Sequence, residues 1–436
     1  MLANQTLAAT AKSALNCLQI AQDWQNLIKA QQNGLYRFAI NQGPVTWPVK
    51  HSAPFSEYVA KTKAIINSRN KRAKQSCPVL TPTAKTLGYS KEQLTVLDLI
   101  APFELRQANR ERAILLIHGL TDSPFTFHFL ADTFYQQGYN VRAVLLPGHA
   151  TAPSDLQLVK LSHWQALINY AITRTAEDFE QFAVVGYSTG AALAVSHVAQ
   201  SDPENLRAMA LISPATEPHN KHAWLAKWIA RIPFLNWLDE DADYDFAKYE
   251  SFPWQAAALA DAAMQGLKTA SLPDDLPLFT AFSEVDSTID SNASIAMLKR
   301  FASTNPSPKK QVLYYYGNPN SATAQLPDGY KVLTPYCEHA SCNKVIDMSH
   351  IGILQPPSHP YYGWKGIYRS CGGYLENPAK YLECKQHSAP LLGERTQSNM
   401  SHAVPLQRLT FNPAYGDFAN HLSSFINDAM PNHVQP

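Results

Sequence analysis

The sequence predicts an α/β fold in which helices cover both faces of a mostly parallel sheet. Short apolar blocks alternate with longer helical patterns from about residue 96 to residue 316. One of these blocks leads directly into a serine between two glycines and then into an alanine-rich helical pattern. Such alternation is typical of parallel sheets, because parallel neighbours need a crossover connection that is usually a helix.

Six apolar blocks are the expected strands, because each is short, apolar and bounded by turn residues. They cover residues 113–117, 141–146, 182–187, 207–212, 278–282 and 311–316. Amphipathic or alanine-rich patterns predict helices over 127–137, 162–179, 189–200, 291–302 and 416–429. Gly138 is expected to end the first helix, and Ser162 with Gln165 to form a capping box at the start of the second.

The chain of 436 residues is long for one hydrophobic core, so we expect additions to a single α/β core. The expected regions are a helical N-terminal extension (1–90), the α/β core (91–316), an irregular insertion rich in Pro, Gly and Cys (317–412) and a C-terminal helix of the core (413–436). Helical patterns over 7–32 and 55–67 support the first of these.

Residues 216–272 interrupt the regular alternation and are rich in aromatic side chains. These are Trp224, Trp228, Phe234, Trp237, Tyr244, Phe246, Tyr249, Phe252 and Trp254. A cap over an apolar site would have this composition. Alternatively, the aromatic side chains only pack the segment onto the core, as amphipathic helices usually do.

The composition is that of a soluble globular protein, with 45% hydrophobic residues and 36 basic against 35 acidic side chains. The balanced charge disfavours nucleic acid as a partner. No run of about 18 apolar residues is present, so we expect no transmembrane segment. The N-terminus also lacks the layout of a signal peptide.

Four of the six cysteines, Cys337, Cys342, Cys371 and Cys384, lie in the Pro- and Gly-rich insertion. Regions without a core of their own often need disulfides, so we expect one or two here, which favours export over the cytoplasm. The alternatives are free buried thiols or a zinc site that includes His339 or His387. The spacing of Cys337 and Cys342 departs from the usual two-residue gap between zinc ligands.

Ser188 lies at a predicted strand-to-helix turn, in the pattern Gly186-Tyr187-Ser188-Thr189-Gly190. The two glycines remove side chains that would collide where a strand turns sharply into a helix. A serine is a useful nucleophile only when a neighbouring base takes its proton. Ser188 is therefore a candidate nucleophile, and the alternative is an ordinary helix N-cap.

A serine that attacks a carbonyl group also needs backbone N–H donors for the oxyanion that forms. The N–H of Thr189 is one candidate, and the N–H of Leu120, which follows another predicted strand, is the second. Gly119 would let this loop approach the reacting carbon. We interpret His118 as a residue that braces the loop, since it comes too early in the chain to be the base.

The acid and the base of such a site follow the serine in the order Asp or Glu, then His. Asp286 emerges after the predicted strand 278–282 and is the preferred acid, with Glu284 and Asp290 as rivals. Of the fifteen histidines, His339, His350, His359, His387 and His402 lie between the last strand and the closing helix. His350 is preferred because it ends a short apolar segment, and His339 and His402 are the main alternatives.

With these residues assigned, the region from about 96 to 316 and the final helix resemble the alpha/beta-hydrolase superfamily, in particular its bacterial carboxylesterase and monoacylglycerol lipase-like branch. The resemblance is carried by RERAILLIHGLTDSP, LLPGHATAPSDL, VVGYSTGAALA and LFTAFSEVDSTID. It implies the alpha/beta-hydrolase fold, with Ser188 as nucleophile, Asp286 as acid and His350 as base. It also implies an oxyanion hole at Leu120 and Thr189 and a cap at the aromatic segment.

The chain departs from this family in two places. The family usually reaches its histidine in a short loop after the last strand, whereas roughly thirty residues precede His350 here and roughly sixty follow it before the closing helix. Residues 1–90 also have no counterpart in the minimal fold. The position of the histidine is therefore the least constrained part of the expected site.

The sequence thus predicts a serine hydrolase that cleaves carboxylic esters with an apolar acyl or alcohol part, without a metal or a cofactor. One alternative is a peptide or amide hydrolase of the aminopeptidase type, whose acidic residues would bind the amino end of the substrate. A candidate cluster, which a solvated turn also explains, is Asp239, Glu240, Asp241, Asp243 and Asp245. Another alternative is a binding protein that keeps the fold without turnover.

Overall fold

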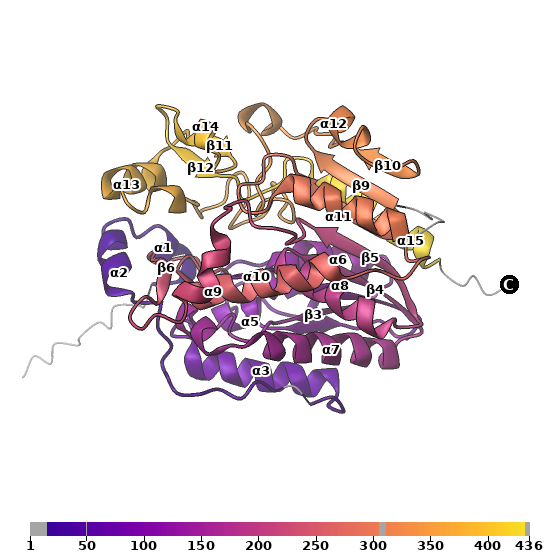
Figure 1. Cartoon of the computed structure of the whole chain (residues 1–436). Coiled ribbons are helices and arrows are strands. Elements are labelled where there is room, and N and C mark those ends of the chain that lie inside the picture. Colours follow the sequence, from indigo (N-terminus) through magenta and orange to yellow (C-terminus); the bar gives the residue numbers. More distant parts are fainter. Residues whose placement is uncertain (1–14, 49, 305–310, 432–436) are drawn as a thin grey trace, which may run out of the picture.

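A twisted sheet of eight strands lies at the centre of the computed structural model, which describes residues 15–48, 50–304 and 311–431 (Figure 1). Its strand order is β1-β3-β2-β4-β5-β8-β9-β10. β1 is antiparallel to β3, and the other neighbours are parallel. The bounds are β1 Phe103–Leu105, β2 Arg112–Ile117, β3 Asn140–Val144, β4 Gln181–Tyr187, β5 Leu206–Ile212, β8 Leu278–Ser283, β9 Gln311–Tyr316 and β10 Tyr330–Leu333.

All six predicted strands are present, and the predicted parallel α/β architecture is confirmed. The two edge strands β1 and β10 were not predicted, because one is very short and the other lies inside the irregular insertion. The block that begins at Val96 is a helix, α5 (Val96–Ile100), which Thr95 caps, rather than the start of strand structure.

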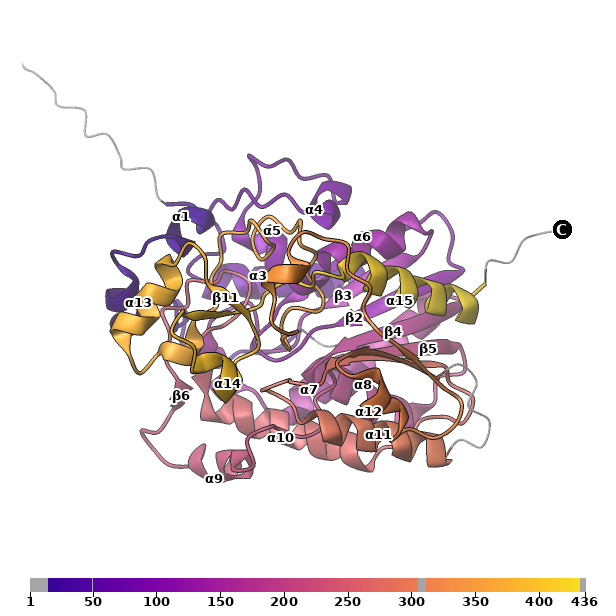
Figure 2. The same cartoon turned by 90° about the horizontal axis from the view of Figure 1, so that it is seen from above.

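Helices cover both faces of the sheet, as Figure 2 shows from above. α7 (Leu161–Asp178), α8 (Thr189–Ser201), α10 (Trp254–Thr269) and α11 (Ser291–Thr304) lie on one face, and α6 (His128–Gln136) and α15 (Tyr415–Ala429) lie on the other. Alternate residues of β2 point to the two faces: Leu115 packs in the buried cluster on the side of α7 and α8, and Leu116 in the buried cluster on the side of α6 and α15. Burial on both faces explains why the central strands are almost wholly apolar.

The predicted capping box of Ser162 and Gln165 is wrong. α7 begins one residue earlier, at Leu161, so Ser162 lies inside the first turn and cannot act as the N-cap. At this helix start the Nδ1 atom of His163 accepts the N–H of Lys160 at 3.3 Å. A histidine three residues after the cap thus does what the glutamine was expected to do.

Residues before the sheet form short helices that lie against the core. They are α1 (Cys17–Ala21), α2 (Leu27–Asn33), α3 (Phe55–Arg69), α4 (Pro82–Thr86) and α5. The helix expected over 7–32 is thus two helices, and residues 7–14 lie outside the described residues. α3 lies beside α7 (Figure 1), and the Tyr58 hydroxyl both donates to the carbonyl of Leu145 at 3.2 Å and accepts its N–H at 2.9 Å.

The two irregular segments contain only short elements apart from α10. The segment over 216–272 includes a 3₁₀ turn at Ala223–Leu225, α9 (Ala226–Ile229), β6 (Trp237–Asp239) and β7 (Phe252–Pro253). The insertion holds α12 (Pro319–Thr323), β10, 3₁₀ turns at Cys342–Lys344 and Gly372–Tyr374, α13 (Pro378–Gln386), β11 (Leu391–Gly393), α14 (Gln397–Met400) and β12 (Leu406–Arg408). Both views place α13 and β6 with α1 and α2 at one end of the molecule.

Three disulfides crosslink the described chain. Cys337–Cys342 and Cys371–Cys384 confirm the predicted disulfides of the insertion, so the free-thiol and zinc alternatives are wrong for these cysteines. Cys17–Cys77 joins two segments separated by 60 residues and was not predicted. Within the described ranges, no helix has both the length and the apolar content needed to cross a membrane.

Candidate active site

Ser188 occupies the turn between β4 and α8 with φ 51° and ψ −117°. This conformation is strained for a side chain-bearing residue and is kept by the surrounding close packing. A Cβ atom on Gly186 would lie 2.5 Å from Ala191 Cα, and one on Gly190 would lie 2.3 Å from the Ile117 carbonyl oxygen. The two glycines are therefore required by contacts that allow no side chain at either position.

The structure brings together the three side chains that the sequence selected. His350 Nε2 lies 3.0 Å from Ser188 Oγ, and His350 Nδ1 lies 2.6 Å from Asp286 Oδ2. With the proton on Nδ1, the ring donates to the carboxylate and accepts the serine hydroxyl. All three side chains are almost completely buried.

Asp286 is fixed by the backbone of its own loop. Its Oδ1 atom accepts the N–H groups of Thr288 at 2.8 Å and of Ile289 at 2.9 Å, which leaves Oδ2 for the histidine. The rival acids contact other groups, since Glu284 accepts the N–H of Asn318 and Asp290 pairs with Lys221.

The rival histidines likewise lie elsewhere. His339 Nδ1 bonds to the hydroxyl of its near neighbour Ser341 at 2.7 Å, and His402 is exposed. The His350 ring packs against the Tyr187 ring with centroids 5.6 Å apart, so a residue of the predicted turn also supports the histidine.

The two N–H groups selected as oxyanion donors are available for a ligand. In the part of the chain that the structure describes, neither the Leu120 N–H nor the Thr189 N–H donates to another protein group. A Cβ on Gly119 would lie 2.9 Å from the Cβ of Ser188, so glycine is needed for this close approach.

His118 is held by backbone on both sides of its ring. Its Nε2 atom accepts the Leu146 N–H at 3.0 Å, so Nδ1 carries the proton and donates to the Gly119 carbonyl at 2.7 Å. Burial lowers the pKa of His118 well below its ordinary value, so the ring is neutral. These contacts fix the loop that carries Leu120.

A cavity of about 530 Å³ opens beside Ser188 and His350. One part of its wall is apolar and comes from the segment over 216–272: Leu225, Ala226, Ile229, Ala257, Ala260 and Met264. The other part is polar and comes largely from the insertion and the loop before β7: Lys248, Glu250, Tyr362, Tyr368, Arg395 and Arg408. Two chemically different surfaces thus meet at the serine.

Eight of the nine aromatic side chains of the segment over 216–272 divide into three groups, so each of the two interpretations applies to a part of them, and the ninth, Trp237, packs against the Phe38 ring with centroids 5.9 Å apart. Tyr249, Phe252 and Trp254 line the cavity. Tyr244 and Phe246 are buried in satellite clusters that pack the segment onto the rest of the molecule. Three others are exposed, namely Trp224, Trp228 and Phe234.

The sequence missed a charged pair in the cavity wall. Lys248 Nζ lies 3.1 Å from Asp122 Oδ1 and 5.5 Å from the centre of the Tyr362 ring. Burial raises the pKa of Asp122, and Lys248 opposes that rise. Asp122 directly follows the predicted Leu120 loop and so could have been found, whereas nothing in the sequence links it to Lys248.

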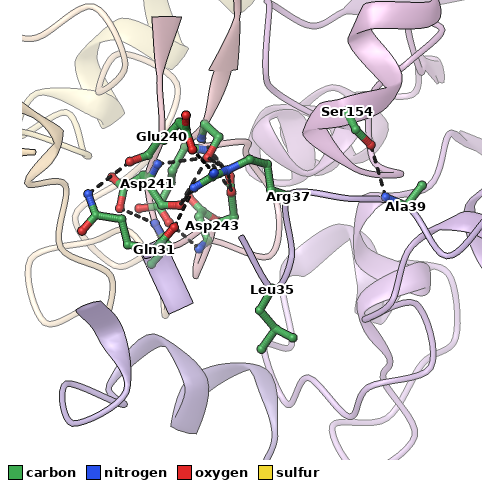
Figure 3. Close-up of polar contacts among 12 residues, drawn as sticks. Gln31, Leu35, Arg37, Ala39, Ser154, Glu240, Asp241 and Asp243 are labelled. Atoms are coloured by element: carbon green, nitrogen blue, oxygen red, sulfur yellow. Dashed lines mark hydrogen bonds and ion pairs between the residues drawn. The ribbon is translucent and has the colours of Figure 1, made fainter. Parts of the chain in front are cut away.

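Three of the five residues of the acidic cluster proposed for an amino end, Asp241, Asp243 and Asp245, are buried. Figure 3 shows Arg37 of the N-terminal segment reaching into it, with contacts to Glu240 and to the Asp241 carbonyl at 3.1 Å. Ser251 bridges Arg37 and Asp243, since its hydroxyl accepts from Arg37 Nε at 3.1 Å and donates to Asp243 at 2.6 Å. A solvated turn is therefore wrong for Asp241 and Asp243, which are buried, whereas Glu240 is exposed.

Two further carboxylates of this cluster bind tyrosines of the insertion: Tyr381 contacts Asp241, and the Tyr362 hydroxyl donates to Asp245 at 2.7 Å. Burial raises the pKa of Asp241 to about 6, and the pKa of Asp245 to about 7. Asp239, by contrast, is exposed in the cavity wall. Among the described residues, no group of His, Cys, Asp and Glu has the arrangement of a metal site.

Comparisons with known proteins match the α/β part of the chain. The family described as "Serine aminopeptidase, S33" matches residues 108–262. A thermostable monoacylglycerol lipase from Bacillus sp. (strain H-257) is 28% identical over 113 residues, which are 26% of this chain. The matched part spans 44% of that protein's length.

Solved structures of low identity overlap about half of the chain. A monoacylglycerol lipase from Paleococcus ferrophilus has 15% identity and a TM-score of 0.39, covering 54% of this chain and 88% of its own. A soluble variant of the monoglyceride lipase from Saccharomyces cerevisiae, in complex with a substrate analog, has 14% identity and a TM-score of 0.38, covering 54% and 81%. With its sheet order and its matched segments, this chain has the alpha/beta-hydrolase fold and a distant relative among monoacylglycerol lipases.

Proposed function

We propose that this protein is a serine hydrolase that cleaves carboxylic esters with an apolar acyl or alcohol part. The observation that carries the proposal is the continuous contact from Ser188 through His350 to Asp286 at the wall of a cavity. A hydroxyl paired with a neutral imidazole, which a carboxylate orients, is the arrangement that acyl transfer to serine requires.

In the first half of the reaction, Ser188 Oγ attacks the ester carbonyl carbon while His350 Nε2 takes the hydroxyl proton. The carbonyl oxygen becomes an oxyanion, which the N–H groups of Leu120 and Thr189 stabilise. The imidazolium returns the proton to the leaving alcohol as the C–O bond breaks. An acyl-enzyme and the free alcohol result.

In the second half, water takes the place of the alcohol. His350 removes a proton from the water as its oxygen bonds to the acyl carbon, and then gives that proton to Ser188 Oγ as the acid leaves. Asp286 holds the imidazole in one tautomer throughout and stabilises its cationic form. The serine is regenerated, and no further reactant is needed.

The apolar wall of the cavity supports an apolar part in the substrate. Ile229 and Met264 are among its residues, and burial of a methylene group against such a surface contributes about 0.8 kcal/mol. The name of the Bacillus relative, a monoacylglycerol lipase, agrees with an apolar acyl group.

Amide hydrolysis is the second candidate, because the matched family is described as a serine aminopeptidase. Most of the acidic residues that could hold an amino end are occupied: Asp241 contacts Tyr381, Asp243 accepts from Ser251 and Asp245 accepts from Tyr362. Asp239 alone of this group lines the cavity as an exposed carboxylate in the described chain. The ester function is therefore the better supported of the two.

The proposal is tested with p-nitrophenyl esters of increasing acyl length beside aminoacyl p-nitroanilides. Wild type should hydrolyse the esters in preference, and Ser188→Ala should lose at least about 10³-fold in kcat/KM. Ser196→Ala, on the same helix α8, is the matched control and should keep its rate. A fluorophosphonate should label wild type and not Ser188→Ala; an unlabelled wild type would favour a binding protein, and faster anilide cleavage would favour the amide hydrolase.

A further inference from the structure

Glu394, in the loop after β11, is completely buried next to the main chain of His350. Its Oε2 atom accepts the His350 N–H at 2.8 Å. The His350 carbonyl group accepts longer bonds, from Tyr187 at 3.3 Å and from Ser213 at 3.5 Å. The bond to Glu394 is therefore the shortest of these contacts on the histidine backbone.

Arg408, on β12, binds the same carboxylate with two parallel hydrogen bonds. Its Nε donates to Glu394 Oε1 at 2.6 Å, and one terminal nitrogen donates to Oε2 at 2.8 Å. Such a bidentate pair fixes the orientation of both side chains. Burial alone would raise the pKa of Glu394, but Arg408 and the donated hydrogen bonds lower it to about 2, so the carboxylate is charged.

The pair also contacts the loop that carries the acid. The Ser287 hydroxyl donates to Glu394 Oε1 at 2.9 Å, and Arg408 donates to Thr288 Oγ1 at 2.6 Å. Ser287 and Thr288 directly follow Asp286, whose Oδ1 atom accepts the Thr288 N–H. One buried ion pair thus touches the segment on either side of the His350–Asp286 hydrogen bond.

These contacts help to explain how a histidine that no strand carries is held beside the serine. His350 lies in the irregular insertion, more than thirty residues after β9, and no strand of the described sheet carries it. His350 lies where the insertion contacts the loop of Asp286, and the pair of Glu394 and Arg408 links the insertion to that loop. A displacement of about 1 Å in a catalytic group can lower the rate by about 10²-fold.

We propose that Glu394 and Arg408 are positioning residues, which hold the loop of His350 against the loop of Asp286. This inference rests on the proposed function for its kinetic consequences. Because Glu394 has no exposed surface, it cannot contact a substrate, and its effect must reach the reaction through His350. Arg408 lines the cavity, so its substitution can affect binding as well.

The test compares Glu394→Gln with Glu104→Gln, which breaks another largely buried ion pair, with Arg142 at the distant edge of the sheet (2.8 Å). Glu394→Gln should lower kcat by about 10- to 100-fold with little change in KM. It also leaves the positive charge of Arg408 unbalanced near His350, which disfavours the positively charged form of the imidazole. The acidic limb of the kcat/KM profile should therefore move to lower pH. Glu104→Gln should change neither kcat nor the profile.

A readout that does not need turnover separates this inference from the proposed function. The Nδ1 proton that bridges His350 and Asp286 should give a downfield ¹H NMR signal in wild type and in Glu104→Gln. In Glu394→Gln the signal should move or broaden, because the two loops lose their connection. If wild type shows the signal but hydrolyses no ester, the proposed function fails and the spectrum still decides the positioning role.

Arg408→Lys keeps the charge but loses the paired geometry, and it provides a second variant if Glu394→Gln does not fold. An intermediate loss of kcat and an intermediate change of the proton signal are expected. The inference is overturned if folded Glu394→Gln, or Arg408→Lys in its place, keeps the wild-type kcat, pH profile and proton signal. It is also overturned if Glu104→Gln shows the same changes.

Discussion

The sheet that carries Ser188 and the insertion that carries His350 are stabilised by different forces. All seven residues of β4 are buried, and the turn after it is fixed by backbone contacts around Gly186 and Gly190. The insertion also packs Met348, Ile353 and Leu354 onto the sheet, but it adds two disulfides, the pair of Glu394 and Arg408, and hydrogen bonds from its tyrosines. Ser188 thus depends on dispersed apolar packing, whereas His350 depends in addition on a few specific polar and covalent links.

The largest effect is expected from a substitution of Gly190, in the close-packed turn that follows β4 of the sheet. A Cβ there would lie 2.3 Å from the Ile117 carbonyl oxygen and 2.5 Å from that of His118, so Gly190→Ala must move the backbone that positions Ser188 and the Thr189 N–H. We expect a loss of at least about 10³-fold in ester hydrolysis and about 3 kcal/mol or more of stability. Fluorophosphonate labelling and thermal unfolding measure the two quantities.

Gly416→Ala is the matched control, because no heavy atom lies within 4 Å of the added Cβ in helix α15. It should keep full activity and unfold at an equal or slightly higher temperature. Equal activities and unfolding temperatures of Gly190→Ala and Gly416→Ala would contradict the conclusion that a side chain at position 190 displaces the turn.

An intermediate effect is expected on the insertion side, from Cys371→Ser with Cys384→Ser. Both cysteines are buried and their disulfide closes a loop of 13 residues, so its loss should destabilise the insertion by about 2 to 4 kcal/mol. Activity should fall about tenfold or more because the insertion carries His350. Hydrogen exchange should accelerate in the insertion and remain slow in the central strands.

Substitution of both Cys337 and Cys342 by serine should have a smaller effect on stability and activity, because these cysteines lie only five residues apart. If hydrogen exchange accelerated equally in the sheet and the insertion, the two regions would unfold as one unit. This result would contradict the difference between their stabilising interactions.

The smallest effect is expected from Asp245→Asn, at the contact between the loop before β7 and Tyr362 of the insertion. Burial raises the pKa of Asp245 from 3.8 to about 7. Between these values the folded protein keeps a proton that the unfolded chain has lost, so stability falls as pH rises from about 4 to about 7. Asparagine is neutral throughout, so the variant should gain about 1 to 3 kcal/mol relative to wild type over this window.

Chemical denaturation at pH 4 and pH 8 measures this difference. Asp328→Asn, at an exposed turn, should change stability equally at both pH values. If the free energy of unfolding differed between Asp245→Asn and wild type by the same amount at both pH values, burial would not raise the pKa of this carboxyl group.

The sequence was most informative where structure is local. The strand, the glycines and Ser188 lie within a few residues, so their pattern could be recognised directly, and Asp286 followed from the end of a strong apolar block. His350 was selected only by its place in the chain and its apolar neighbours. The structure brings it to Ser188 and holds it there by contacts from Glu394, which Arg408 pairs with, and from Tyr187, and no spacing rule connects these residues to it.

The parts that were not predicted all depend on distant partners. Cys17 and Cys77 are 60 residues apart, Asp122 and Lys248 are 126 apart, and the edge strands β1 and β10 are too short to show a period. Such pairs cannot be chosen among many equivalent combinations without knowledge of the fold.

The contact of Arg37 with Glu240 spans 203 positions of the chain, which has a consequence for how the protein is made. As a ribosome releases the polypeptide from its amino end, Arg37 and the disulfide-forming Cys17 and Cys77 emerge before the acidic residues do. Arg37 therefore cannot contact Glu240 until after the turn at Ser188 has been translated. Completion of this contact is therefore a late event in biogenesis, because Glu240 is translated 203 residues after Arg37.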